Sequence, residues 1–268
     1  MLYLYKPGTY ARNIARALDI GTVTVNNKGS FIKRTRKNQL RCDLNWGMGR
    51  SAISQAAFLD VLKPDRLASM YNADIYIPVS KVRTFDALKA VNILVPTYSK
   101  NYTDINQRGK YLARKDFGTG GSGIEVVECG KIPSKEADFY TIVIAKACEV
   151  RIHVFGGRVI CEQVKYIPKG SKVLIRSYDN GARFSAKNIS SEMGEKNAEK
   201  ARKIAIDAVA ACGIQFGAVD MIMGHNNGGL YVLEVNTAPG ISPLDDDQPG
   251  REVRSTYESY LNAIEELL

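Results

Sequence analysis

The sequence has few cysteines and histidines and lacks the motifs that use them. Its five cysteines are odd in number and form no CxxC pair, and only two histidines are present. This composition disfavours a disulfide framework or a zinc site and favours a reducing, cytoplasmic location. No apolar run is long enough to span a bilayer, and the first residues do not resemble a secretory signal. We therefore expect a cytoplasmic protein without a membrane partner.

Two familiar nucleotide-binding signatures are also missing, although a glycine-rich turn is present. GTGGSG at 118–123 is not followed by the GK[ST] of a Walker loop, and no helix begins after it as in a dinucleotide fingerprint. Strand-like runs flank it instead. Glycine permits close backbone approach, so the N–H groups of such a hairpin can bind phosphate oxygens. Arg114 and Lys115 precede it on opposite pleat faces, and either could offer a cation to a polyphosphate.

Acidic residues are scarce at the start of the chain. The net charge is +9, and residues 1–50 contribute +8 of it, with ten Lys or Arg against Asp19 and Asp43. This distribution indicates an anionic partner, such as nucleic acid, a phosphorylated ligand or an acidic peptide, bound through residues 28–41. A solvated basic hairpin around FIKRTRK would explain the same charges without a partner.

Residues 216–240, FGAVDMIMGHNNGGLYVLEVNTAPG, carry the strongest signal. HNNGG is a turn between two β-rich runs, and centring it on Asn227 places Asp220 opposite Glu234 and Ala218 opposite Asn236. The same register predicts the pairs Val219–Val235, Met221–Leu233, Ile222–Val232 and Met223–Tyr231. Opposed Cβ atoms lie about 4.5–5.5 Å apart, and two carboxylates at that separation repel unless a proton or cation lies between them. Oxygen ligands favour Mg²⁺ or Mn²⁺ over zinc, so a hard cation is predicted on Asp220, Glu234 and Asn236.

A second strand, EVRIH, alternates polar and apolar side chains. Glu149, Arg151 and His153 share one face, which must meet either solvent or a cleft, while the other face fills the core. His153 is expected to line a site or to be structural rather than to bind zinc. Lys165 on the next strand, and Arg176 and Asn180 in the loop IRSYDNG, would join the same cleft. Without a cleft they form an ordinary charged strand and turn.

The coarse secondary structure indicates an α+β fold with two or three lobes. Helices are predicted over 80–91, 195–212 and 255–268, with the second carrying a small-residue stripe. The segments Phe139–Ile144, Glu149–Phe155 and Val159–Tyr166 are expected to form a meander.

In their order along the chain, the motifs CEVRIHVFGGRVI, IRSYDNGARFS, FGAVD and LEVNTAPGIS resemble those of the ATP-grasp superfamily of carboxylate–amine ligases. The likeness is greatest to small bacteriophage-encoded members. It implies an ATP-grasp fold, in which two α+β lobes clasp the nucleotide, preceded by a small α/β lobe. The implied boundaries are a basic first lobe at 1–75, a small lobe with a glycine-rich lid at 76–136, and a large lobe with the metal hairpin at 137–268.

The resemblance also implies residue roles. It gives ATP and Mg²⁺ as cofactors, with Mn²⁺ as a substitute, and places the metal on Asp220, Glu234 and Asn236. The lid would close over the triphosphate, and YTIVIAK would hold the adenine. The implied nucleotide-binding residues are Lys81, Arg114, Lys115, Gly120, Gly121, Ser122, Gly123, Lys146, Glu149 and His153. The implied catalytic residues are Arg151, Lys165, Arg176 and Asn180.

The implied reaction is ligation. A carboxylate attacks the γ-phosphate of ATP to give ADP and an acyl phosphate, and an amine then displaces phosphate to form an amide or peptide bond. Two alternatives remain open at this stage. One is a phosphotransferase on the same scaffold, and the other is a nucleic-acid-binding protein with a regulatory or vestigial ATP site, in which Phe31 and Trp46 stack on bases.

Overall fold

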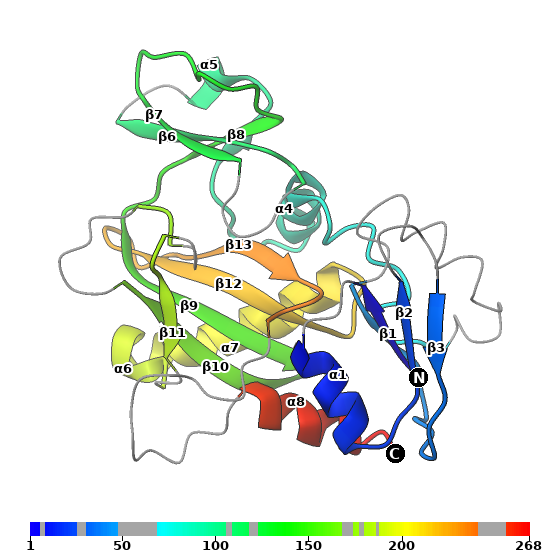
Figure 1. Cartoon of the computed structure of the whole chain (residues 1–268). Helices are drawn as coiled ribbons and strands as arrows, with labels where there is room; N and C mark the ends of the chain where they lie inside the picture. The colour runs from blue at the N-terminus through cyan, green and yellow to red at the C-terminus, as the bar shows by residue number, and fades with distance from the viewer. Residues whose placement is uncertain are drawn as a thin grey trace.

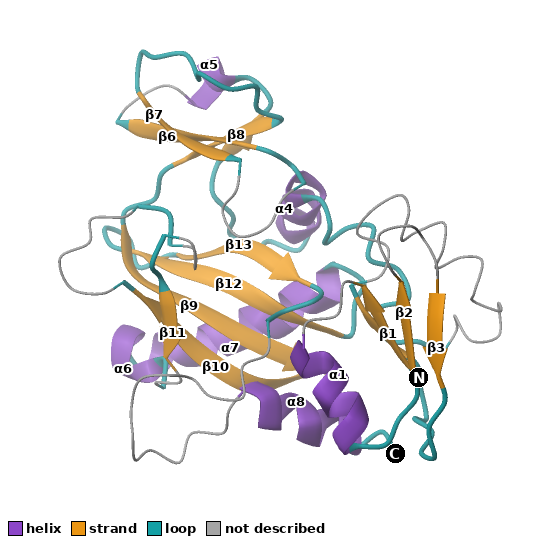
Figure 2. Cartoon of the chain, in the orientation of Figure 1, coloured by secondary structure: helices purple, strands orange, loops and turns teal. Residues whose placement is uncertain are grey.

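The computed structural model places the described residues in three β-sheets with helices packed against them (Figure 1). Strands and helices follow one another without regular spacing, which confirms the α+β class (Figure 2). None of the described helices is long and apolar enough to cross a membrane. The described residues are 1–5, 9–25, 31–47, 69–105, 109–117, 123–167, 174–176, 180–185, 188–240 and 256–268.

The first sheet is built from the start of the chain and has the strand order β3-β2-β1-β4. Its strands are β1 (Leu2–Tyr5), β2 (Thr22–Val25), β3 (Phe31–Arg34) and β4 (Leu44–Trp46). Helix α1 (Thr9–Ala17) connects the parallel strands β1 and β2. Helix α8 (Thr256–Glu265), near the other end of the chain, packs Tyr260 against Trp46 with ring centroids 5.0 Å apart. The two ends of the chain therefore share one hydrophobic core, and the termini lie close together (Figure 1).

The second sheet is small and antiparallel, with the order β5-β8-β6-β7. It contains β5 (Tyr98–Ser99), β6 (Lys110–Arg114), β7 (Ile124–Glu128) and β8 (Phe139–Ile142), together with α4 (Lys81–Ala90) and α5 (Tyr102–Ile105). Because β8 pairs with β6, the predicted meander is wrong in its first strand, and the expected boundary at residue 136 falls inside this sheet. The sequence prediction paired strands that follow one another in the sequence. In the structure, β8 belongs to the small sheet, and the chain enters the third sheet only with β9.

The third sheet is the largest, with the order β11-β10-β9-β12-β13. Its strands are β9 (Lys146–Phe155), β10 (Arg158–Tyr166), β11 (Arg183–Ser185), β12 (Phe216–Gly224) and β13 (Leu230–Asn236). Helices α6 (Ser190–Met193) and α7 (Glu195–Ala211) cover one face, as Figure 1 shows. The stripe of buried alanines predicted on α7 lets the helix lie close to β9 and β12. The opposite face is left to form a cavity with the small sheet.

The β12–β13 hairpin has the predicted register only near Asp220 and Glu234. Asp220 pairs with Glu234 and Ala218 with Asn236, as expected, and Val219 pairs with Val235. Beyond Asp220 the register shifts, so the three remaining predicted pairs are wrong; the observed pairs are Met221–Val232, Ile222–Tyr231 and Met223–Leu230. Leu233 is the extra residue of a β-bulge, which symmetric counting from the turn could not reveal.

Candidate active site

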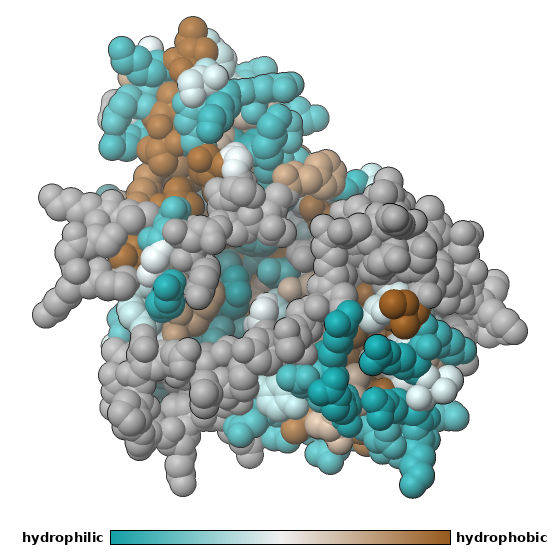
Figure 3. Space-filling model, viewed as in Figure 1, coloured by the Kyte–Doolittle hydropathy of each residue, from teal (hydrophilic) through white to brown (hydrophobic). Residues whose placement is uncertain are grey.

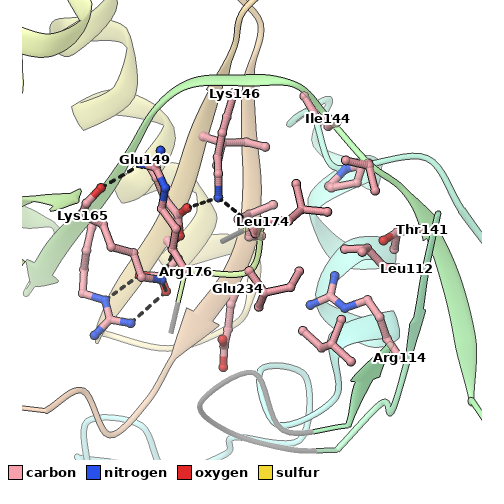
Figure 4. A pocket seen from close by; sticks show the side chains of 18 of the residues that line it. Leu112, Arg114, Thr141, Ile144, Lys146, Glu149, Lys165, Leu174, Arg176 and Glu234 are labelled. Carbon is pink, nitrogen blue, oxygen red and sulfur yellow. Dashed lines mark hydrogen bonds and ion pairs between the residues drawn. The ribbon is translucent and has the colours of Figure 1, made fainter. Parts of the chain in front are cut away.

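A cavity of about 340 Å³ lies between the third sheet and the small sheet. One part of its wall is apolar and includes Leu112, Ile144, Leu174 and Ile222. Another part is charged and contains residues from β6, β9, β10, β12 and β13 (Figure 4). Apolar walls with a few convergent polar groups are typical of a small-molecule site. The bulge places Leu233 and Glu234 in the same lining.

The two opposed carboxylates lie at the charged part of this wall. Asp220 is buried, and its carboxylate accepts hydrogen bonds from Arg151 Nε at 2.5 Å and Nη2 at 2.8 Å. Lys165 Nζ lies 3.7 Å from the same carboxylate. Burial alone would raise the pKa of Asp220, but Arg151 and Lys165 outweigh it and hold that pKa at about 2. Asp220 is therefore ionised at neutral pH.

This donor set fits a hard divalent cation. Asp220, Glu234 and Asn236 all line the cavity and supply only oxygen ligands from carboxylate and amide groups. Arg151 takes two of the roughly four lone-pair positions of the Asp220 carboxylate, which leaves others for a metal. Within the part of the chain that the structure describes, no three His, Cys, Asp or Glu side chains cluster as a metal site.

Glu149 is the centre of a second ion-pair group beside Asp220. It is buried, and its carboxylate lies 2.6 Å from Lys146 Nζ and 2.8 Å from Lys165 Nζ. Lys146 also donates to the carbonyl of Leu174 at 3.1 Å, and burial lowers its pKa although Glu149 opposes the shift. Figure 4 shows Glu149 and the two lysines side by side. Glu149 and Arg151 therefore face a cleft rather than open solvent.

Two arginines offer unused donors to this cavity. Arg114 enters from β6 on the small-sheet side, and Arg176 enters from the opposite side (Figure 4). The Nε atoms of both are buried, and no described residue accepts a hydrogen bond from either. Burial lowers the pKa of Arg114 to about 10, while Glu234 opposes the shift, so the guanidinium stays charged at neutral pH. Buried cationic donors without acceptors are suited to an anionic ligand.

Comparison with solved structures identifies this arrangement of lobes. The chain matches the ATP-grasp ligase PsnB complexed with minimal precursor, with a TM-score of 0.65 and 12% identity over 100% of this chain and 99% of that one. The D-alanine–D-alanine ligase of Bacillus anthracis complexed with ATP gives a TM-score of 0.61 at 13% identity, over 99% of this chain and 95% of that one. The chain has the ATP-grasp fold.

Sequence comparison reaches a smaller part of the chain. A D-alanine–D-alanine ligase of Xanthomonas axonopodis pv. citri (strain 306) is 33% identical over 99 residues, which cover 35% of this chain and 29% of that protein. No family model matches the chain. The fold is therefore established, whereas the reaction must be argued from the site.

Several predicted nucleotide-binding residues lie elsewhere in the ATP-grasp fold. Lys115 points away from the cavity and pairs with Asp138 at 3.3 Å, so Arg114 is the cation that lines it. Lys81 begins α4 outside the cavity lining, and its Nζ donates to the carbonyl of Asp116 at 3.2 Å. Gly123 adopts a positive φ of 75°. Gly120, Gly121 and Ser122 lie outside the described residues, so the lid stays a prediction.

Two other predicted site residues do not line the cavity. Asn180 is exposed and donates to the carbonyl of Ile175 at 2.9 Å, so its contact is within the loop. His153 is fully buried between Gln163 at 3.0 Å and the Tyr260 hydroxyl at 3.2 Å. It shares the polar face of β9, but α8 packs over that end of the strand. Its predicted nucleotide contact is replaced by a structural role.

Phe184 is a cavity residue that the sequence analysis missed. Its ring lies 4.4 Å from the guanidinium carbon of Arg151 and 5.6 Å from Lys165 Nζ. The contact is a cation–π interaction that holds both cations beside Asp220 and Glu149. Only the pairing of β11 with β10 brings Phe184 opposite Lys165, and no local sequence signal marks it.

The neutral state of His153 predicts a pH-dependent stability. Burial, together with Arg151, lowers the pKa of His153 from 6.5 to about 4. The unfolded chain therefore binds a proton that the folded chain excludes, and stability falls as the pH drops from about 6.5 towards 4, by about 3 kcal/mol in total. We expect urea unfolding of His153→Phe to show a smaller decrease between pH 7 and pH 5 than the parent protein. An unchanged slope would assign the acid sensitivity to other groups.

Proposed function

We propose that the protein is an ADP-forming carboxylate–amine ligase. The observation that carries this proposal is one cavity containing the opposed carboxylates Asp220 and Glu234 together with unused donors of Arg114 and Arg176. Paired carboxylates suit Mg²⁺ or Mn²⁺, and buried guanidinium groups suit a polyphosphate. Together they suit phosphoryl transfer from ATP to a substrate carboxylate.

The lining suggests how the nucleotide is held. The apolar wall around Ile142, Val143 and Ile144, on the connection between β8 and β9, accommodates the base. Arg114 from the small sheet and Arg176 from the opposite side then contact the phosphates. The loop at 118–123 would close over the triphosphate, and Asp220, Glu234 and Asn236 would hold a divalent cation that neutralises phosphate charge.

Charge neutralisation is the main contribution of these residues to the reaction. Phosphoryl transfer needs positioning and stabilisation of negative charge more than covalent help from the protein. Arg176 donates to the Lys165 carbonyl at 3.0 Å through Nη1, which fixes its orientation and leaves Nε for the transferred group. Arg151 and Lys165 keep Asp220 ionised in a buried wall, and Lys165 also pairs with Glu149 at 2.8 Å. The acyl phosphate formed on the substrate then reacts with an amine and releases phosphate.

The similar proteins guide the choice of substrates. One solved neighbour is a ligase complexed with a precursor peptide, and others are D-alanine–D-alanine ligases. We therefore propose small-molecule or peptide carboxylates and amines as substrates. The likeness of CEVRIHVFGGRVI to phage-encoded proteins supports a phage origin and action in the cytoplasm of a bacterial host.

The test is ADP release from Mg-ATP in the presence of pooled amino acids and short peptides. A ligase sustains ADP release over many turnovers when a carboxylate and an amine are both supplied, because the amine consumes the acyl phosphate. Mass spectrometry then finds an amide. A stable phosphorylated product without an amine would instead identify a phosphotransferase. Absence of nucleotide turnover with every pool, together with nucleic-acid binding, would contradict the proposal.

Arg114 should contribute mainly to nucleotide affinity. Replacing it with glutamine removes a buried cation from the cavity, so the KM for ATP is expected to rise by about tenfold to a hundredfold. Arg114→Lys should recover part of the loss because the charge is retained. Lys115→Gln is the matched control, since its side chain pairs with Asp138 outside the cavity. Equal effects of the two glutamine variants would contradict the assignment.

A further inference from the structure

A second hollow lies in the first lobe, between α1 and the strands β2 and β3, and has a volume of about 60 Å³. It shares no lining residue with the nucleotide cavity. Four arginines line it: Arg12, Arg16, Arg34 and Arg36. In the space-filling view, strongly hydrophilic residues gather over α1 and β3 (Figure 3).

The backbone explains why these arginines converge. Arg12 and Arg16 are one helical turn apart on α1, so they project from the same side of the helix. Arg34 lies opposite Thr22 in the β2–β3 ladder, and Thr24 lies two residues further along the same face of β2. Both threonines also line the hollow and are largely buried. Arginines from the helix and from the strand thus line the same hollow as the two threonine hydroxyl groups.

The positive charge of this hollow is poorly compensated. In the described part of the chain, Asp19 is the one acid within ion-pair distance of these arginines, and it lies 3.5 Å from Arg36 Nη1. Both side chains of that pair are about 40% exposed, so the pair is weak. Four cations around one small space repel one another, and a bound anion would relieve that repulsion.

We propose that this hollow binds a phosphate group with two negative charges, either free phosphate or the terminal phosphate of a small phosphorylated molecule. Guanidinium groups match phosphate oxygens with paired N–H donors, and the Thr22 hydroxyl adds a further donor. The Thr24 hydroxyl donates to the carbonyl of Ile32 at 3.4 Å. The volume suits a single anion. Because the four arginines line one small hollow, they match a dianion better than a row of singly charged phosphodiesters.

The structure also argues against stacking of unpaired bases on Trp46. Recognition of unpaired bases uses exposed aromatic rings as stacking platforms. Trp46, one of the two rings considered for this role, is 6% exposed and packs against Phe216 and Tyr260. The side chain of Phe31, the other ring, lies outside the described residues. The proposal does not depend on the ligase assignment, because the residues of the two sites differ.

Isothermal titration of the full chain with inorganic phosphate and with glycerol phosphate, at constant ionic strength, tests the proposal. We expect the double variant Arg16→Gln, Arg34→Gln to weaken binding about tenfold or more, since charged hydrogen bonds are lost. The matched control is Lys33→Gln, Lys37→Gln, which removes the same charge. Lys33 lies on the opposite face of β3 from Arg34, and neither lysine lines the hollow. This control should change affinity less than about twofold.

Several results would overturn the proposal. These are equal weakening by the two double variants, equally tight binding of acetate, absence of phosphate binding, and oligonucleotide binding that phosphate does not displace. Arg114→Gln should leave phosphate binding intact. Loss of phosphate binding in that variant would show that the phosphate binds in the nucleotide cavity instead. Tighter binding of glycerol phosphate than of inorganic phosphate would identify a phosphorylated molecule as the ligand, and the reverse order would identify free phosphate. Circular dichroism of every variant separates lost binding from lost folding.

Discussion

Replacing Glu234 with glutamine is expected to lower ATP turnover by about two to three orders of magnitude. The substitution keeps the size of the side chain but removes one of the two carboxylates that face each other across the β12–β13 hairpin. With Asp220 already paired with Arg151, Glu234 would supply the other negative charge for the proposed divalent cation. The measurement is steady-state ADP release across a Mg²⁺ titration, and the variant should require more Mg²⁺ for half-maximal rate.

Glu128→Gln provides a matched control for this experiment. Glu128 lies on β7 of the small sheet, its side chain is exposed and pairs with Lys110, and it does not line the cavity. Its turnover should equal that of the parent protein within about twofold. Near-parental turnover of Glu234→Gln, with an unchanged Mg²⁺ requirement, would refute the metal assignment of Glu234.

Removal of Arg151 is expected to give the largest loss of stability. Arg151→Leu leaves the Asp220 carboxylate buried without its two closest donors, and breaking a buried ion pair in this way costs about 3–5 kcal/mol. Lys165 lies 3.7 Å from that carboxylate and compensates only in part. The free energy of unfolding in urea, measured for both proteins at pH 7, gives the difference directly.

Two further variants make this prediction specific. Arg158→Leu removes an arginine that pairs with Glu266 at the surface, where both side chains are more than half exposed. It should cost less than about 1 kcal/mol. Adding Asp220→Leu to Arg151→Leu removes the unpaired charge, so the double variant should recover part of the stability. A destabilisation of Arg151→Leu no greater than that of Arg158→Leu would show that Asp220 is not held by this pair.

Features with a short sequence period were predictable. The polar–apolar alternation of EVRIH places Glu149 and Arg151 on one face of β9, and the structure has them in the cavity wall. The pairing of Asp220 with Glu234 follows from the position of the turn and is observed. The stripe of alanines on α7 is observed as well. Each of these depends on backbone geometry that repeats every two or 3.6 residues, so neighbouring residues carry the information.

The sequence by itself determined the α+β class, the two carboxylates that face each other, and the uneven charge of the first lobe. Only the tertiary structure decided that Arg114 rather than Lys115 enters the cavity, because the choice depends on which pleat face of β6 meets the third sheet. Only the tertiary structure showed that His153 is buried. Helix α8 covers that end of β9, although it lies more than a hundred residues later in the chain. The physical reason is common to both. A strand's period fixes which side chains share a face, whereas contacts between distant segments fix what that face meets.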